Sequence, residues 1–297
     1  MILLIFIVRK CVLFRTGQVC GMSYNLKNKI REKVAKFISN SKLMNDYMND
    51  IEHVFFKNID YLVHVNSKEN KKVLYTCITG NYDRLLLQKF IADDYDYVCF
   101  TDNSQLLSYS NYGAWIIKPL TSNMQDAVLS SRWHKTHPHI LFPEYEASIF
   151  IDGNIRLNSG YFIKAAEDKN IPLVIPKHNI RNCVFEEIEA VMKIIVPKGI
   201  TSDISVKKMH EFLILNEMPH NYGFLESNFI YRKHNDKKVI KIMEEWWHFI
   251  ETMVNRDQLS LPYVLYKNNI KPEDISIPNL RHKERDAVFS CHNYGRK

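Results

Sequence analysis

The sequence has few of the features that mark linkers, redox motifs or membrane spans. Its 297 residues include only nine Gly and ten Pro, which argues against a disordered or low-complexity chain. The six cysteines, spread from Cys11 to Cys291, form no CxxC pair, so neither a zinc knuckle nor a redox dithiol is indicated. The apolar run Met1–Val8 is far shorter than the roughly 20 residues that span a bilayer. These absences favour a globular protein with reduced thiols, and we expect it in the cytoplasm.

Composition and charge narrow the class further. Hydrophobic residues make up 46% and charged residues 25%, and the length suffices for one large α/β domain or two small ones. The net charge of +7 suits an anionic ligand or a membrane surface. Basic and acidic residues alternate along the chain and no recognition motif is present, so we expect no nucleic-acid partner.

The chain divides into a predicted N-terminal helical extension, residues 1–72, and a predicted catalytic domain, residues 73–297. Residues 1–21 make a poor signal peptide, and we expect translation to start at Met22. Residues 26–56 show helical spacing of apolar side chains with a basic opposite face, which either lies peripherally on a membrane or is simply solvated. The polar stretch Asn66–Lys72 reads as a linker.

The catalytic domain shows compact apolar runs that alternate with helical patterns, which predicts an α/β fold with a mostly parallel central sheet flanked by helices. A crossover helix is expected over Ser122–Thr136, because Ser122 and Gln125 form a capping box. The predicted strands are Val73–Ile78, Tyr97–Thr101, Ala114–Ile117, Ser148–Asp152 and Ser227–Arg232, and the later helices are Cys183–Ile195, Lys237–Val254 and Asp257–Lys267.

Polar residues follow three of these strands. In open α/β sheets, ligands bind beyond the carboxyl ends of the strands. Asp152 and Asn154 bracket Gly153 at one such end, where their oxygens suit Mg²⁺ or Mn²⁺, although Asp-Gly is also a common turn pair. The turn from Thr79 through Gly80 and Tyr82 to Asp83 suits a nucleotide, and Thr101 with Asp102 suits a base or ribose, or a plain surface turn. No Walker or GxGxxG run accompanies them, so P-loop and Rossmann binding are disfavoured.

Taken in order, five segments resemble the bacterial and plant DUF616 (TOD1/MUCI70-like) glycosyltransferase domain over about residues 73–270. They are Thr79–Asp83, Tyr97–Asp102, Arg132–Lys135 with Leu141–Tyr145, Ile151–Asn154 and Asn255–Tyr263. The resemblance implies a GT-A-like nucleotide-sugar fold with a divalent metal at Asp152 and Asn154. Asn stands where the family motif has a second Asp, which implies weaker metal affinity. A late metal-binding His is implied too, either His282 or His292.

The resemblance also implies roles for other side chains. Arg132 and Lys135, one helical turn apart, would stabilise the diphosphate leaving group, unless they form a solvated helix end. Asp257 would contact sugar or acceptor hydroxyls, or act as general base. Further sugar-contact candidates are Glu226, Asn228, Arg256, Gln258, His178, Arg181 and the pair Glu186–Glu187.

Two aromatic groups are not expected to carry the chemistry. His134, His137 and His139 do not have the spacing of a zinc helix, so we expect structural or solvent-facing roles for them and no zinc. Trp246 and Trp247 lie in a helical apolar pattern and are expected to pack in the core.

These observations predict a hexosyltransferase-type enzyme that uses Mn²⁺ or Mg²⁺. It would move a sugar from a nucleotide donor, a UDP-sugar in particular, to a glycan acceptor in capsule or O-antigen biosynthesis at the cytoplasmic membrane face. Two alternatives stay open. The first is a non-catalytic module that binds a nucleotide sugar or glycan, and the second is a metal-dependent phosphohydrolase built around Asp152.

Overall fold

The computed structural model describes residues 71–122, 124–282, 285–290 and 292. The predicted N-terminal helix, the start at Met22 and most of the linker before residue 72 lie outside these residues, so they remain predictions. Within the described ranges, no helix combines the length and the apolar character that crossing a membrane requires.

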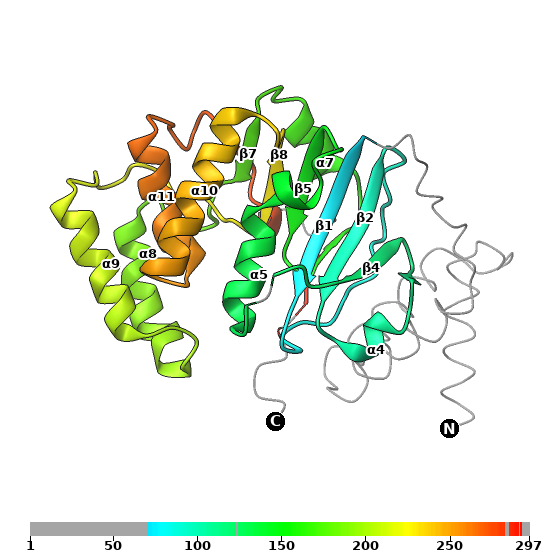
Figure 1. The fold of residues 1–297 in the computed structure, drawn as a ribbon. Coiled ribbons are helices and arrows are strands. Elements are labelled where there is room, and N and C mark those ends of the chain that lie inside the picture. Colours follow the sequence, from blue (N-terminus) through cyan, green and yellow to red (C-terminus); the bar gives the residue numbers. More distant parts are fainter. Residues whose placement is uncertain (1–70, 123, 283–284, 291, 293–297) are drawn as a thin grey trace, which may run out of the picture. The chain divides into compact units, whose positions relative to one another are not determined.

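An eight-stranded sheet forms the centre of the described domain (Figure 1). Its order is β3 (Asn111–Tyr112), β4 (Trp115–Pro119), β2 (Tyr95–Thr101), β1 (Lys72–Ile78), β5 (Ala147–Ile151), β8 (Phe229–Arg232), β7 (Leu173–Pro176) and β9 (Ser276–Ile277). Strands β4, β2, β1 and β5 run parallel, whereas β8 runs antiparallel to both of its neighbours. The predicted α/β class with a mostly parallel sheet is therefore confirmed, and β1, β5, β7 and β2 all end at the same edge.

The central strands are apolar along almost their whole length because both faces of the sheet are covered. In β1, for example, Val73 and Tyr75 belong to the core on one face, and Leu74 and Ile78 belong to the core on the other. The free thiol of Cys77, predicted to be buried, lies in the first of these cores.

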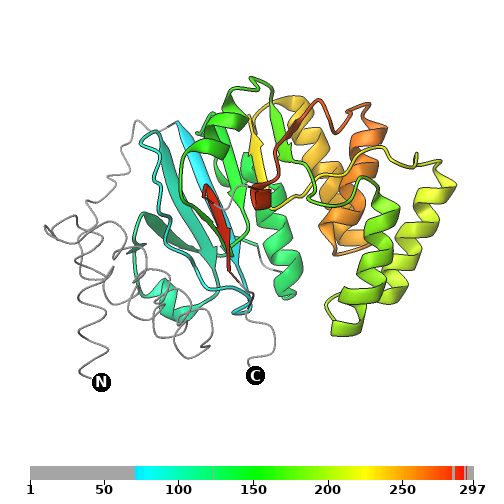
Figure 2. The ribbon, with the colours of Figure 1, turned by 180° about the vertical axis from the view of Figure 1, so that it is seen from behind.

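Helices cover the two faces unequally (Figures 1 and 2). Helices α5 (Ala127–Thr136), α10 (Lys237–Thr252) and α11 (Asp257–Lys267) pack on one face, where Trp246 and Trp247 of α10 are buried as predicted. Helix α7 (Tyr161–Glu167) packs on the other face, together with a small antiparallel sheet of β6 (Ile155–Leu157) and β10 (Ala287–Phe289). The short helices α4 (Ser104–Leu107) and α6 (Pro138–Leu141) lie in connections.

A third core lies away from the sheet, beyond α11 (Figure 1). It is formed by α8 (Val184–Ala190), the π-helical turn η1 (Val191–Ile195) and α9 (Asp203–Leu215) against α11. Two short 3₁₀ turns, η2 (Val196–Lys198) and η3 (Leu280–His282), complete the described elements.

The predicted start of the crossover helix is wrong. Helix α5 begins at Ala127, and its N-cap is Asp126, whose Oδ1 accepts the N–H groups of Val128 at 2.7 Å and Leu129 at 2.9 Å. Ser122 Oγ lies 2.6 Å from Ser130 Oγ instead of capping a helix. A carboxylate at the helix start competes well with a serine further upstream, because it also interacts favourably with the helix dipole.

Candidate active site

The polar residues predicted at strand ends gather at one edge of the sheet. The Thr79–Asp83 turn follows β1, Asp102 follows β2 and Asp152 follows β5, and these strands are neighbours and parallel. Asp152 also faces Asn228 across the sheet, because its N–H donates to the Asn228 carbonyl at 2.9 Å. The carboxyl edge of the sheet therefore presents these groups to a common region.

Five side chains form what we call the Lys135 cluster: Arg132, Lys135, Asp152, Ser227 and Asp257. The buried Lys135 Nζ lies 2.5 Å from Asp257 Oδ2, 3.1 Å from Ser227 Oγ and 3.8 Å from Asp152 Oδ1. Arg132 Nη2 lies 3.4 Å from Asp257 Oδ1, and Ser227 Oγ donates to Asp257 Oδ2 at 3.0 Å. Helix α5 supplies both cations, and the start of α11 supplies the carboxylate that they share.

The two carboxylates of this cluster differ in exposure and in charge balance. Asp257 is almost fully buried, whereas the Asp152 side chain is 34% exposed. Burial alone would raise the pKa of Asp257, but the charges of Arg132, Lys135 and Arg256 lower it below its ordinary value. Burial raises the pKa of Asp152, and the charges of Lys135 and Arg132 offset this rise only in part. Asp257 is thus a fixed counter-ion, and Asp152 is the carboxylate that has room for a ligand.

Two residues that sequence reasoning missed hold α5 in place. Arg232 of β8, fully buried, donates from Nη1 to the Lys135 carbonyl at 2.6 Å and from Nη2 to the Tyr75 hydroxyl at 2.6 Å. Tyr75 of β1 in turn donates to the His134 and Lys135 carbonyls at 3.1 Å. These bonds fix the last turn of the helix that carries Lys135. A buried arginine within an apolar strand is the signal that would have found this contact.

Asn228 has a buried amide with an unusual lack of partners. It is 5% exposed, and neither its Oδ1 nor its Nδ2 has a hydrogen-bond partner among the residues that the structure describes. A buried amide left unpaired costs free energy, so such a group suits a ligand hydroxyl. Its predicted role in sugar contact fits this position.

A second group, which we call the His292 cluster, consists of Asp83, Asn154 and His292. His292 Nδ1 lies 2.6 Å from Asp83 Oδ1, and its Nε2 lies 3.5 Å from Asn154 Nδ2. Asn154 Nδ2 also donates to the Ser290 carbonyl at 3.2 Å. Of the two predicted late histidines, His292 thus lies beside the Asp152 turn, whereas His282 ends the exposed turn η3.

The donor chemistry around Asp152 fits a magnesium or manganese ion. Carboxylates of Asp152 and Asp83, the Asn154 amide oxygen and the His292 imidazole are suitable ligands for such ions. Among the described residues, however, no three His, Cys, Asp or Glu side chains converge in a ready metal site. The arrangement therefore fits an ion held by one or two carboxylates and completed by substrate phosphates.

Close packing explains the glycine between Asp152 and Asn154. A Cβ atom at Gly153 would lie 2.7 Å from Ile78 Cγ1, so a side chain here would push the Asp152 turn away from β1. The glycine thus keeps the ends of two adjacent strands in contact.

The Thr79 turn is held from within the protein. Gly80 and Asn81 both have positive φ, and the Tyr82 N–H donates to the Thr79 carbonyl at 3.1 Å, which closes a tight turn. Asp102 accepts the Gly80 N–H at 2.9 Å, and Thr101 is fully buried. Asp102 therefore shapes the predicted nucleotide turn, and Tyr82, 38% exposed, is its accessible aromatic group.

Most of the remaining predicted sugar-contact residues form a third group beyond β7 and β8, together with Arg281, which was not predicted. We call it the Arg181 cluster: His178, Arg181, Glu187, Glu226, Arg256 and Arg281. Gln258 lies half-buried in the first turn of α11, next to this group. Glu186 accepts the Asn182 N–H at 3.1 Å at the start of α8.

The predicted structural roles of the histidines agree with their positions. His134 is fully buried, and its Nδ1 lies 2.8 Å from the Ser130 carbonyl. His137 is buried against the Trp133 ring, and His139 Nε2 lies 2.9 Å from Glu244 Oε1.

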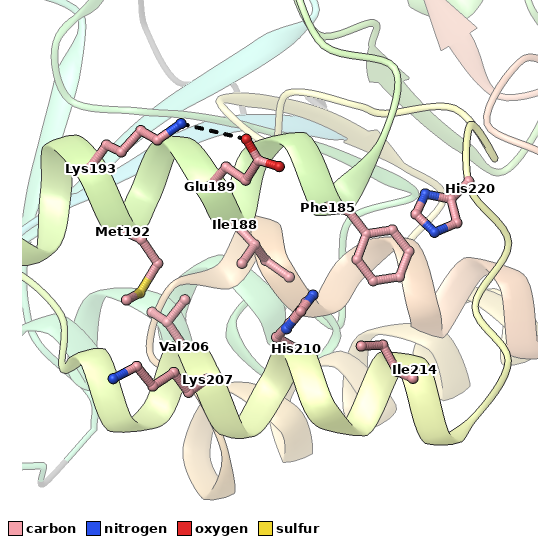
Figure 3. A pocket seen from close by; sticks show the side chains of 10 residues that line it. All are labelled: Phe185, Ile188, Glu189, Met192, Lys193, Val206, Lys207, His210, Ile214 and His220. Carbon is pink, nitrogen blue, oxygen red and sulfur yellow. Dashed lines mark ion pairs between the residues drawn. The ribbon is translucent and has the colours of Figure 1, made fainter.

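A groove of about 600 Å³ lies elsewhere, between α8 with η1 and α9 (Figure 3). Phe185, Ile188 and Met192 face Val206, His210 and Ile214 across it. Its acidic residue, Glu189, pairs with Lys193 at 3.6 Å. The carboxylates and cations of the Lys135 cluster lie at the sheet edge and not in this groove. We therefore assign the catalytic site to the sheet edge.

Comparisons with known proteins identify the family of the chain. The family described as TOD1/MUCI70, glycosyltransferase-like domain, matches residues 56–293. No curated protein matches the chain.

Similar solved structures include the following three chains. The WbbM bifunctional glycosyltransferase is 10% identical (TM-score 0.39), with 67% of this chain and 38% of that one covered. Mouse xyloside xylosyltransferase 1 is 8% identical (TM-score 0.39; 70% and 85% covered). S. aureus TarS is 16% identical (TM-score 0.35; 67% and 56% covered). The chain thus spans less than two thirds of WbbM and of TarS.

Proposed function

The chain belongs to the TOD1/MUCI70 glycosyltransferase-like family, and from that premise we propose that it transfers a sugar from a nucleotide donor to a glycan acceptor. The observation that carries this proposal is the Lys135 cluster at the carboxyl edge of the sheet. There, two cations and a partly exposed carboxylate lie beside a turn suited to a nucleotide. A UDP-sugar is the proposed donor.

The donor would lie between the Thr79 turn and Asp152. The 38% exposed Tyr82 ring suits stacking on the nucleotide base, whereas the Gly80 and Tyr82 N–H groups hold the turn itself together. Asp152, together with Asn154 and His292, would hold a Mn²⁺ or Mg²⁺ ion. Such an ion, when bound, supplies positive charge that stabilises a departing diphosphate.

The protein's own cations contribute to the same stabilisation. Arg132, with a side chain 20% exposed, is placed to reach a diphosphate oxygen, whereas Lys135 is fully buried and held by Asp257. Cations fixed before the reaction need little reorganisation as the bond to the leaving group breaks. Asp257 fixes both of them, so we propose that it acts as a positioning residue instead of a general base.

Asn228 is the proposed contact for a sugar hydroxyl. Its amide is buried beside Asp152, and its NH₂ donor group and its carbonyl acceptor have no hydrogen-bond partner among the described residues. A hydroxyl, which both donates and accepts, matches this pair.

We place the reaction in the assembly of a surface polysaccharide, such as a capsule or O-antigen, at the cytoplasmic face of a membrane. The predicted basic helix over residues 26–56 supports peripheral attachment there. Deleting the gene in its host and analysing the surface glycan would test this pathway. An unchanged glycan composition would count against it.

The central test is nucleotide release by the purified full-length chain. UDP-, GDP- and CMP-sugars are incubated with glycan extracts, with Mn²⁺, with Mg²⁺ or with EDTA, and released nucleotide is quantified by chromatography. Asp152→Asn is compared with Asp93→Asn, which removes an equal charge from an exposed position before β2. We expect metal-dependent release by the wild type and by Asp93→Asn, and its loss in Asp152→Asn.

Other outcomes point to the two alternatives. Binding of a nucleotide sugar without turnover in the presence of acceptor would favour a non-catalytic module. Release of inorganic phosphate without any acceptor would favour a phosphohydrolase.

A further inference from the structure

The Arg181 cluster brings three arginines together around two buried carboxylates. Arg181 Nη1 donates to Glu187 Oε2 at 2.7 Å, and Arg256 Nη2 lies 3.6 Å from Glu187 Oε1. Arg281 donates from Nε and Nη2 to Glu226 Oε1 at 3.1 and 3.0 Å. Three guanidinium groups against two carboxylates leave one positive charge in excess.

The carboxylates are largely satisfied, whereas the arginines are not. Glu226 Oε2 also accepts from Asn279 Nδ2 at 2.7 Å, and both glutamates are less than 10% exposed. Each arginine has five N–H donors. Arg256 Nε is buried without a partner among the described residues, and the three arginine side chains remain 25%, 25% and 44% exposed. The cluster thus presents spare donors to solvent.

His178 adds a further donor. Its Nδ1 accepts the N–H groups of Ile180 at 3.2 Å and Arg181 at 3.0 Å, so a neutral ring carries its proton on Nε2. Burial, together with Arg181, Arg281 and Arg256, lowers the pKa of His178 despite the nearby Glu226. The Nε2–H donor then lies 3.3 Å from the Arg181 Nη1 donor. Because Arg181 Nη1 also donates to Glu187 Oε2, the donors that Arg181 has left for a ligand are those of Nε and Nη2.

The sheet topology places this cluster at the same edge as the nucleotide turn but away from that turn. His178 and Glu226 lie just beyond the ends of β7 and β8, at the same edge as Asp152. The nucleotide turn follows β1, and the order β1-β5-β8-β7 separates it from the cluster by three strand spacings, about 14 Å. Arg256 and Glu226 are the chain neighbours of Asp257 and Ser227, so the cluster adjoins the Lys135 cluster.

We propose that the Arg181 cluster binds an oxyanion of the acceptor, a carboxylate or a phosphate, and that the acceptor is therefore an acidic glycan. The inference rests on the proposed glycosyltransferase function and names the acceptor class for it. Guanidinium groups bind both anions through paired, charge-assisted hydrogen bonds. A neutral acceptor would leave the excess charge and the donors of His178 and Arg181 without a partner.

Direct binding to the full-length chain tests the proposal. The probes are glucuronate, inorganic phosphate, glucose as the neutral analogue of glucuronate, and UDP with Mn²⁺, each titrated at low salt and followed by calorimetry or NMR. The variants are Arg181→Gln and Arg281→Gln, and the control is Lys208→Gln, which removes one positive charge from an exposed position on α9.

We expect saturable binding of glucuronate or phosphate but not of glucose. Each arginine variant should weaken anion binding about tenfold or more, which corresponds to losing charge-assisted hydrogen bonds. Lys208→Gln should bind like the wild type, and the affinity for UDP should be unchanged in all variants. Binding of glucuronate but not of phosphate would identify a uronic acid acceptor. Binding of phosphate but not of glucuronate would identify a phosphate-bearing acceptor.

Several results would overturn the inference without touching the proposed function. One such result is a wild type that binds UDP but neither anion. Another is anion binding that is equally strong in the wild type and in both arginine variants. A matching loss of UDP affinity in Arg181→Gln would assign the cluster to the donor. A wild type that did not bind UDP would instead reject the UDP-sugar donor of the proposed function. Arg281→Gln keeps the test valid if Arg181→Gln does not fold.

Discussion

At the scale of single residues, Asp152 and Asp257 face the same lysine but have opposite pKa shifts. Asp257 lies between Lys135, Arg132 and Ser227, and its charged form is stabilised. Asp152 is farther from Lys135, at 3.8 Å, and its charged form is compensated less. Paired carboxylates in such different surroundings commonly divide their tasks. Here one positions the cations, and the other is available to a ligand.

Replacing Asp257 by Asn should destabilise the protein. The change leaves Lys135 and Arg132 without their buried counter-ion, and breaking such a pair costs about 3 kcal/mol. Because the folded pKa lies below the unfolded value of about 3.9, this contribution is present above that value and is lost as the pH falls through the folded pKa. Denaturant unfolding from pH 7 downward measures it.

The matched control for that experiment is Asp93→Asn, which should unfold like the wild type. If Asp257→Asn were as stable as the wild type at pH 7, the ion pairs would contribute nothing measurable. A deficit that did not shrink under acid would mean that the lost charge is not its cause.

Donor binding should weaken in acid at a pH above the ordinary carboxyl range. The raised pKa of Asp152 means that its ionised, ligand-binding form disappears as the pH falls through that higher value. Calorimetric titration of UDP with Mn²⁺ at a series of pH values measures this, with Asp152→Asn expected to show weak binding and no such limb. An acid limb that persists in Asp152→Asn would assign the titration to another group.

The sequence predicted the main charged residues of the site but not what supports them. Asp152, Lys135 and Asp257 lie in segments that resemble the family. Tyr75 and Arg232, by contrast, meet across 157 positions of the chain, and no local pattern announces that contact. Arg281 and Glu226, 55 positions apart, likewise meet only in the folded chain, whereas Arg181 and Glu187 lie six positions apart and were predicted in one group.

At the scale of elements, helix α5 decides where both cations of the Lys135 cluster lie. Its start is fixed by the Asp126 cap, and its end is fixed by the bonds from Tyr75 and Arg232 to carbonyls of the last turn. Capped at one end and bound to the sheet at the other, the helix has little freedom to slide.

Asp126→Ala should lower the free energy of unfolding by about 1 kcal/mol, because two N–H groups of the first turn lose their acceptor. Asp126→Ser, which keeps an acceptor, should recover most of that loss. Thermal or denaturant unfolding of the two variants provides the comparison. Equal losses in both would show that the cap bonds are not the stabilising feature.

The apolar patterns predicted the strands more accurately than they predicted the helices. The predicted strands at Val73–Ile78 and Tyr97–Thr101 match β1 and β2, because buried strands carry an almost continuous apolar signal. The helix predicted from Cys183 to Ile195 instead changes to a π-helical turn at Val191, and α9 was not predicted. Helix α9 exposes Ile204 and Leu215, which blurs its amphipathic pattern.

At the scale of the whole described domain, the three hydrophobic cores differ in how well they are shielded from solvent. Two cover the faces of the sheet, and the third lies between α8, α9 and α11. Strand β1 has partners on both sides, whereas α9 leaves Ile204, Ile214 and Leu215 at least 57% exposed. The helical core is therefore the part that should open locally first.

Native-state hydrogen exchange should show this difference. Amides of α9 are expected to exchange through local openings, and those of β1, β2 and β5 only near global unfolding. Helix α10 is the matched control, because it is helical like α9 but packs on the sheet and should share the protection of the strands. Equal protection of α9 and β1 would show a single cooperative unit.

The start of α11 joins two clusters through consecutive residues. Arg256 contacts Glu187, and Asp257 contacts Lys135. A ligand that shifts this helix start therefore alters both binding surfaces at once, and thermodynamic linkage makes the effect mutual. Donor and acceptor are consequently expected to bind cooperatively, each changing the dissociation constant of the other by the same factor. Titrating UDP with and without saturating glucuronate or phosphate measures that factor.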